Sequence, residues 1–107
     1  MRVVLFVPEK ELPLIVQVPT DPRIALGDRV NSRQVYFQNQ ELMLVDLLDA
    51  ESTGQLPNRI VDGKLIYGPF LICMPDFKEL PYPVAGSIRD NAEDWPMAQL
   101  EVYDKPA

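Results

Sequence analysis

Residues 56–72 read LPNRIVDGKLIYGPFLI, and this stretch carries the strongest signals for the fold. Two apolar runs, at residues 64–67 and 70–74, are joined by Gly68-Pro69, and Asp62-Gly63 precedes the first run. An Asp-Gly pair is typical of a tight turn between strands. Gly68-Pro69 indicates a bulge or a bend within one long strand rather than a full reversal. The stretch therefore predicts β-structure.

Eleven prolines spread along the 107 residues favour short strands over long helices, because proline lacks an amide donor and clashes inside a helix. Residues 2–7 and 14–18 are rich in Val, Leu and Ile and predict a β-hairpin with a loop of several residues. Residues 20–33 are expected to form a loop, with one helical turn between Asp21 and Leu26.

The middle of the chain allows two interpretations. Residues 35–37 and 42–48 flank Gln-Asn-Gln-Glu, which permits a second hairpin with Asn39 near the turn. Alternatively, residues 40–52 form a helix with Asn39 as N-cap and Gly54 just beyond the end. The strand is the preferred interpretation, but short apolar runs do not separate the two by periodicity alone.

The C-terminal third predicts less regular structure. The segment after Pro75 is expected to lie extended across a sheet face, with Phe77, Leu80 and Tyr82 as apolar anchors, and residues 98–103 alternate like a half-buried strand. The expected fold is α+β or mostly β, a single small domain over residues 1–107 with about six to eight short strands and at most one or two short helices.

Charge and composition narrow the function classes. Ten basic and sixteen acidic residues give a net charge of −6, which opposes binding to nucleic acid or anionic membranes. The single cysteine, Cys73, excludes an intramolecular disulfide and lies in an apolar run that predicts a buried thiol. The short apolar run at the N-terminus does not fit a signal peptide, and no run has the ~20 apolar residues of a membrane span, so a cytoplasmic protein without membrane contact is expected.

Catalytic groups are sparse. The chain has no histidine, which removes histidine-based triads and imidazole metal ligands, and its five glycines form no phosphate-binding loop. The acidic clusters Asp46, Asp49, Glu51 and Asp90, Glu93, Asp94 lack the pattern of a calcium site and favour solvated surface. The sequence therefore predicts no enzyme activity, no metal and no cofactor.

Four residues are candidates for binding: Asn58, Arg59, Tyr82 and Trp95. Arg59 is predicted to sit in a turn beside buried strands, and turn residues on a rigid scaffold often carry binding. The structural alternative has Asn58 bonding its own turn and Arg59 pairing Asp62 or covering apolar surface. Tyr82 and Trp95, with Met97 nearby, fit either an interface anchor or the core.

One region resembles a known family. Leu56-Pro57-Asn58 and Gly68-Pro69-Phe70, with residues 2–7 as a weaker match, resemble the C-terminal core of a family of small phage- and plasmid-encoded proteins of unknown function. The chain departs from that family in lacking a Gly-Gly-Tyr-like segment near its middle. The resemblance implies a mobile genetic element as the setting and implies no activity.

The leading functional hypothesis is a non-catalytic binding or accessory protein of a mobile genetic element, which acts through a protein-protein surface or self-association as a dimer. The first alternative is an acidic inhibitor that mimics nucleic acid and binds a host defence enzyme, using Asp46, Asp49, Glu51, Asp90, Glu93, Asp94, Glu101 and Asp104. The second alternative is a small carboxylate-dependent enzyme with Asp46, Asp49 or Asp62 as base.

Overall fold

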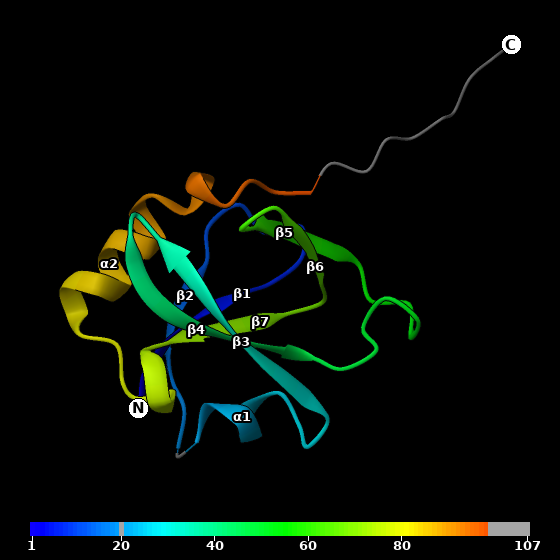
Figure 1. Cartoon of the computed structure of the whole chain (residues 1–107), viewed down its shortest axis with the longest axis horizontal. Coiled ribbons are helices and arrows are strands. Elements are labelled where there is room, and N and C mark those ends of the chain that lie inside the picture. The colour runs from blue at the N-terminus through cyan, green and yellow to red at the C-terminus, as the bar shows by residue number, and fades with distance from the viewer. Residues whose placement is uncertain (20, 99–107) are drawn as a thin grey trace, which may run out of the picture.

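The computed structural model describes residues 1–19 and 21–98 of the chain. Within these residues seven strands form two sheets, and two helices accompany them, so the predicted α+β, mostly β class and the strand count are confirmed (Figure 1). The strands are β1 (Arg2–Phe6), β2 (Leu14–Gln17), β3 (Val30–Phe37), β4 (Gln40–Leu47), β5 (Pro57–Val61), β6 (Lys64–Tyr67) and β7 (Phe70–Cys73). The helices are α1 (Pro22–Ala25) and α2 (Tyr82–Asp90), with short 3₁₀ turns η1 (Pro75–Phe77) and η2 (Ala92–Asp94).

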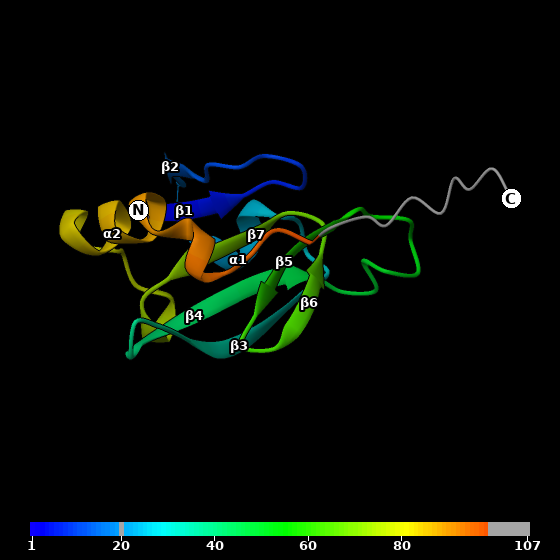
Figure 2. The ribbon, with the colours of Figure 1, turned by 90° about the horizontal axis from the view of Figure 1, so that it is seen from above.

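Five strands form one antiparallel sheet in the order β2-β1-β7-β4-β3, and β5 and β6 form a separate hairpin. Figure 2 shows β1 and β2 on one side of the molecule and β3 on the other, as this order requires. Gly68-Pro69 is the point where the chain leaves the hairpin and joins the larger sheet. The bend was expected, but the flanking strands belong to different sheets and not to one long strand.

The described residues form three hairpins, and short-range turn signals account for two of them. The predicted β1–β2 hairpin is confirmed, and so is the β3–β4 hairpin, where Gln38 and Asn39 have φ values of 50° and 67°. Asp62 and Gly63 also have positive φ and join β5 to β6. Positive φ at both central residues suits the twist of antiparallel strands, which explains the Asn and Asp-Gly choices.

β4 settles the ambiguity in the middle of the chain. It pairs with β3 on one side and β7 on the other, so the preferred strand is confirmed and the helix over residues 40–52 is wrong. Leu42 and Leu44 point to one face of the sheet, and Met43 and Val45 point to the other. Because both faces are covered, residues 42–45 are all apolar, and this part of the strand loses the simple alternation that identifies a half-buried strand.

Three further sequence predictions need correction. Residues 30–33 belong to β3 and not to a loop, because this edge of the sheet tolerates a polar strand. Residues 57–59 are part of β5 and not of a turn. The segment expected to lie extended contains the start of α2, which has Pro81 at its N-cap and Pro83 in its first turn, where a missing amide donor costs nothing.

The helical turn expected between Asp21 and Leu26 is confirmed as α1, and the Asp21 carboxylate caps it by accepting a 2.9 Å hydrogen bond from the amide of Arg23. The strand predicted at residues 98–103 falls outside the described residues except for Ala98.

The core lies on both faces of the five-stranded sheet. One face is covered by α2 and by the β5–β6 hairpin, and its cluster includes the stacked rings of Phe6 and Phe70, whose centroids are 4.7 Å apart. The opposite face carries a smaller cluster that includes Cys73, with Phe77 packed against it. The predicted burial of Cys73 is confirmed, and burial raises the pKa of its thiol to about 12.

Candidate functional site

A β-bulge in β5 explains why two neighbouring polar residues are both buried. Pro57 pairs with Tyr67 and Arg59 pairs with Ile66, so Asn58 is an extra residue without a partner on β6. In a regular strand neighbouring side chains point to opposite faces, but the extra residue of a bulge changes this alternation. Asn58 and Arg59 are therefore both directed into the molecule.

Asn58 joins the hairpin to the larger sheet. Its side-chain amide donates to the carbonyl of Phe6 at 3.0 Å and to the carbonyl of Gly68 at 2.8 Å. The first bond reaches the end of β1, and the second holds the corner between the two sheets. The expectation that Asn58 bonds its own turn is wrong, because the residue is in a strand and its amide faces other segments.

Arg59 acts as a clamp on three segments. Nη1 donates to the carbonyls of Ala92 and Trp95 at 3.2 and 3.1 Å, and Nη2 donates to the carbonyls of Lys10 and Glu11. The guanidinium thus ties β5 to the β1–β2 loop and to the η2 region. The expected pairing of Arg59 with Asp62 is wrong, since the Asp62 carboxylate instead accepts a bond from the amide of Tyr36.

The environment of the clamp is largely desolvated. Arg59 is only 2% exposed and its Nε has no partner among the described residues. Burial lowers the pKa of the guanidinium, and the charges of Glu11 and Glu93 oppose that shift. A buried cation whose donors are met by main-chain carbonyls is a structural arrangement, because four of its five N–H groups are already used.

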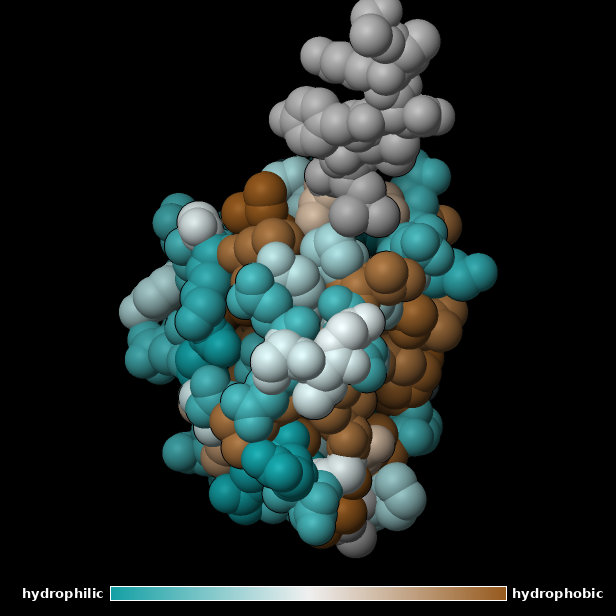
Figure 3. Space-filling view, turned by 90° about the vertical axis from the view of Figure 1, so that its right-hand side faces the viewer, coloured by the Kyte–Doolittle hydropathy of each residue, from teal (hydrophilic) through white to brown (hydrophobic). Residues whose placement is uncertain are grey.

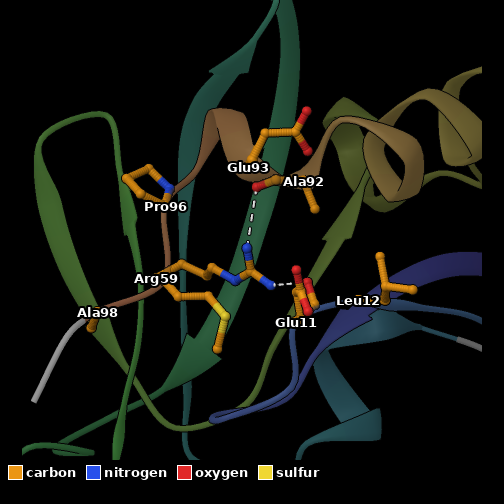
Figure 4. Close-up of a pocket in the computed structure, with 8 residues that line it drawn as sticks. Glu11, Leu12, Arg59, Ala92, Glu93, Pro96 and Ala98 are labelled. Atoms are coloured by element: carbon orange, nitrogen blue, oxygen red, sulfur yellow. Dashed lines mark hydrogen bonds between the residues drawn. The ribbon is translucent and has the colours of Figure 1, made fainter.

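A cavity of about 500 Å³ lies beside Arg59, between the β1–β2 loop and the segment after η2. Figure 4 shows the guanidinium held between Ala92 and Glu11 at the wall of this cavity. Leu12, Pro96 and Met97 supply apolar lining, and Glu11 and Glu93 supply negative charge. Two carboxylates near one occupied guanidinium make the cavity a poor site for an anion.

The other two candidate residues lie apart from each other. Trp95 is 3% exposed and packs against Phe6 and Phe37, so its side chain belongs to the core. Tyr82 is 67% exposed at the start of α2, and the guanidinium of Arg2 lies 3.4 Å from its ring centroid. Arg59 and Trp95 meet through a main-chain carbonyl, whereas Tyr82 does not join them.

A second, smaller cavity of about 230 Å³ brings the acidic cluster Asp46, Asp49 and Glu51 near Arg33 and Lys64. Asp46 is buried, and one of its oxygens accepts from Arg33 at 3.1 Å while the other has no partner among the described residues. Desolvation raises the pKa of Asp46, and the nearby Arg33 opposes that rise. Asp49 pairs with Arg29, so two of the three carboxylates already have cationic partners.

The free edge of β2 is a feature that sequence reasoning located only in general terms. Met1 and Val18 exchange two main-chain hydrogen bonds. Along an antiparallel pair of strands, residue pairs that are hydrogen-bonded alternate with pairs that are not. Val16 and Leu14 therefore also form main-chain hydrogen bonds with β1. The N–H and C=O groups of Ile15 and Gln17 therefore point outward. Within residues 1–19 and 21–98, no main-chain hydrogen bond to another segment occupies these groups.

Exposed apolar side chains accompany this edge. Leu12 and Leu14 are 66% and 54% exposed, and β2 itself contains no charged residue. Figure 3 shows apolar surface exposed in separate patches on one face of the molecule, with hydrophilic side chains between them. The sequence signal for this edge was the uncharged run at residues 14–18 between Pro13 and Pro19, but an edge is defined by sheet order, which is a long-range property.

No helix among the described residues is long and apolar enough to cross a membrane. Searches against known proteins returned no matching family model, no matching curated protein and no matching solved structure.

Proposed function

We propose that the protein is a non-catalytic binding protein that acts through a protein-protein surface, and that this surface is the free edge of β2. The partner supplies an extended, uncharged segment that adds a strand to the sheet. The observation that carries the proposal is the pair of outward-facing residues Ile15 and Gln17, whose main-chain groups are unoccupied next to exposed Leu12 and Leu14.

Each of the other strand edges carries a charged side chain or a main-chain bond to another segment, which supports β2 as the working surface. On β3, the outward amide of Tyr36 donates to the carboxylate of Asp62. Arg33 adds a charge beside the outward groups of Ser32 and Gln34. On β5, the segment 96–98 pairs with the strand through the carbonyl of Pro96 and the amide of Ala98. β6 carries the charged Lys64. Natural proteins commonly protect edges in such ways, because an open edge binds other strands.

The nucleic-acid mimic receives less support. Such an inhibitor needs carboxylates that project unpaired toward a basic groove. Several acidic side chains are instead paired with arginines: Asp21, Asp46, Asp49, Glu79 and Asp90. These pairs reduce the local negative field, so charge alone does not favour this alternative.

The carboxylate-dependent enzyme also receives less support. Asp46 and Asp49 share a cavity but each has an arginine partner, and Asp62 serves as a hydrogen-bond acceptor for β3. The setting in a mobile genetic element is part of the proposal and rests on the resemblance at residues 56–58 and 68–70. Asn58 and Gly68 of those motifs meet through a hydrogen bond, which gives the spacing a structural reason.

Site-specific photo-cross-linking in cells that express the protein tests the proposed surface. A benzophenone side chain at position 14 is compared with one at position 24, because Leu14 and Ile24 are both large, apolar and more than half exposed, and only Leu14 lies on the edge. We expect discrete protein adducts from position 14, their loss when Gln17→Pro is added, and their retention with Gln17→Ala. Equal adducts from both positions, or none from position 14, would refute the proposal.

A further inference from the structure

We infer that the strand which pairs with β2 is β2 of a second copy of this chain, in an antiparallel arrangement with a two-fold axis at Val16. This inference rests on the proposed function and names its partner. In this arrangement Ile15 of each copy pairs with Gln17 of the other, and the two sheets join into one.

The hydrogen bonds of this arrangement follow from the outward groups of β2. Ile15 and Gln17 each offer one N–H and one C=O. An antiparallel pair in which both residues face each other exchanges two main-chain hydrogen bonds. The two symmetric pairs of Ile15 with Gln17 therefore form four hydrogen bonds and satisfy every outward main-chain group of these two residues.

The positions of the prolines fit this register. Residues 13, 15, 17 and 19 are each two positions apart, so the main-chain groups of Pro13 and Pro19 point outward like those of Ile15 and Gln17. Neither proline therefore removes a hydrogen bond between β2 and β1. When Ile15 faces Gln17, Pro13 faces Pro19 of the second copy. Two residues that lack an N–H group then face each other, and neither Ile15 nor Gln17 lies opposite a proline. A shift by two residues would place a proline opposite Ile15 or Gln17 and leave the carbonyl of that residue without a donor.

The side chains of the same register are also complementary. Leu14, Val16 and Val18 point to the face of the sheet that holds the smaller core cluster, where Val16 and Val18 pack. Leu14 would lie opposite Val18 of the second copy, and the two Val16 side chains would meet at the axis. The exposed Leu14 would thus extend the apolar cluster of its partner, and no charged residue within β2 opposes the approach.

Sedimentation velocity on the purified full chain tests the inference. The chain has a mass of 12.2 kDa, and we expect wild type to change from monomer to dimer as its concentration rises. Gln17→Pro removes one outward donor from each copy, and at about 1 kcal/mol per hydrogen bond the loss of two should weaken dimerisation about 30-fold. Gln17→Ala keeps both donors and should leave the dissociation constant within about threefold of wild type.

A second pair of variants tests the side-chain contact. Leu14→Lys places a charge opposite Val18 of the second copy and should shift the protein to monomer, whereas Ile24→Lys makes the same change in charge on α1 and should not. Trp95 fluorescence on urea unfolding reports whether each variant is folded.

Two results would overturn the inference: a wild-type protein that stays monomeric up to about 0.5 mM, well above the dissociation constants of stable dimers, or a dimer whose dissociation constant is the same in Gln17→Pro and Leu14→Lys as in wild type. If wild type is monomeric but position 14 still cross-links to a different protein, the inference fails and the proposed function stands. If wild type is monomeric and position 14 gives no adduct, both fail.

Discussion

Replacing Arg59 by methionine should destabilise the protein by about 3 kcal/mol or more. The substitution keeps an apolar stem and removes the N–H groups that bind four carbonyls. The carbonyls of Ala92 and Trp95 belong to buried residues, and a hydrogen bond from a charged donor is worth about 1.5–3 kcal/mol. The loss of two such bonds costs about 3–6 kcal/mol. Methionine carries no charge, so the variant no longer has the cost of burying a cation, and the net loss of stability falls near the lower end of this range.

Urea unfolding followed by Trp95 fluorescence measures this loss, because Trp95 is the only tryptophan and lies in the core beside the clamp. With a urea slope of about 1.5 kcal/mol per molar, a loss of 3 kcal/mol lowers the midpoint by about 2 M. Arg29→Met is the matched control, because its side chain is 75% exposed and pairs with exposed Asp49. Exposed ion pairs contribute about 0–1 kcal/mol, so the control should lower the midpoint by less than about 0.7 M. Equal midpoints for the two variants would show that water satisfies the four carbonyls and that the clamp does not stabilise the fold.

Three other substitutions or conditions give separate tests. Asn58→Ala should cost about 2–4 kcal/mol in urea unfolding, since two main-chain carbonyls lose a buried donor, and a cost below about 0.5 kcal/mol would contradict the joint between the sheets. Burial raises the pKa of Asp46 above its ordinary 3.8, so this group favours folding at acid pH and loses that contribution as pH rises through its folded pKa. The difference in the free energy of unfolding, wild type minus Asp46→Asn, should therefore decrease from acid to neutral pH. A difference that stays constant or increases would contradict a raised pKa of Asp46 in the folded protein. The thiol of Cys73, with a pKa of about 12, should react with a disulfide reagent at pH 8 only after urea is added, and rapid labelling of the folded protein would show that the smaller core cluster is open.

Local turn chemistry made much of the fold predictable. Asn39 and Asp62-Gly63 marked two reversals because only residues that tolerate positive φ fit there. The β1–β2 hairpin followed from two apolar runs separated by polar residues. The start of α2 was not predicted, because the prolines there indicate an extended chain. Proline is, however, also favoured in the first turn of a helix.

The candidate site was predictable by residue but not by environment. Arg59 stood out as a charge beside buried strands, and the structure places it in the middle of a carbonyl network. A bulge that directs both Asn58 and Arg59 inward leaves no pattern in a single sequence, because it depends on the pairing with β6. The free edge of β2 likewise depends on which strands join the sheet, and those partners are far apart along the chain.

The position of β7 has a consequence for how the chain is made. Although β7 is the last of the seven strands in sequence, it lies between β1 and β4 at the centre of the five-stranded sheet. Until residue 73 leaves the ribosome, the first four strands exist only as two unconnected hairpins, each with its inner edge and apolar faces uncovered. Isolated hairpins are marginally stable in water. Folding of the sheet must therefore wait for about two thirds of the polypeptide, and during that interval the nascent chain is most exposed to aggregation and to chaperones.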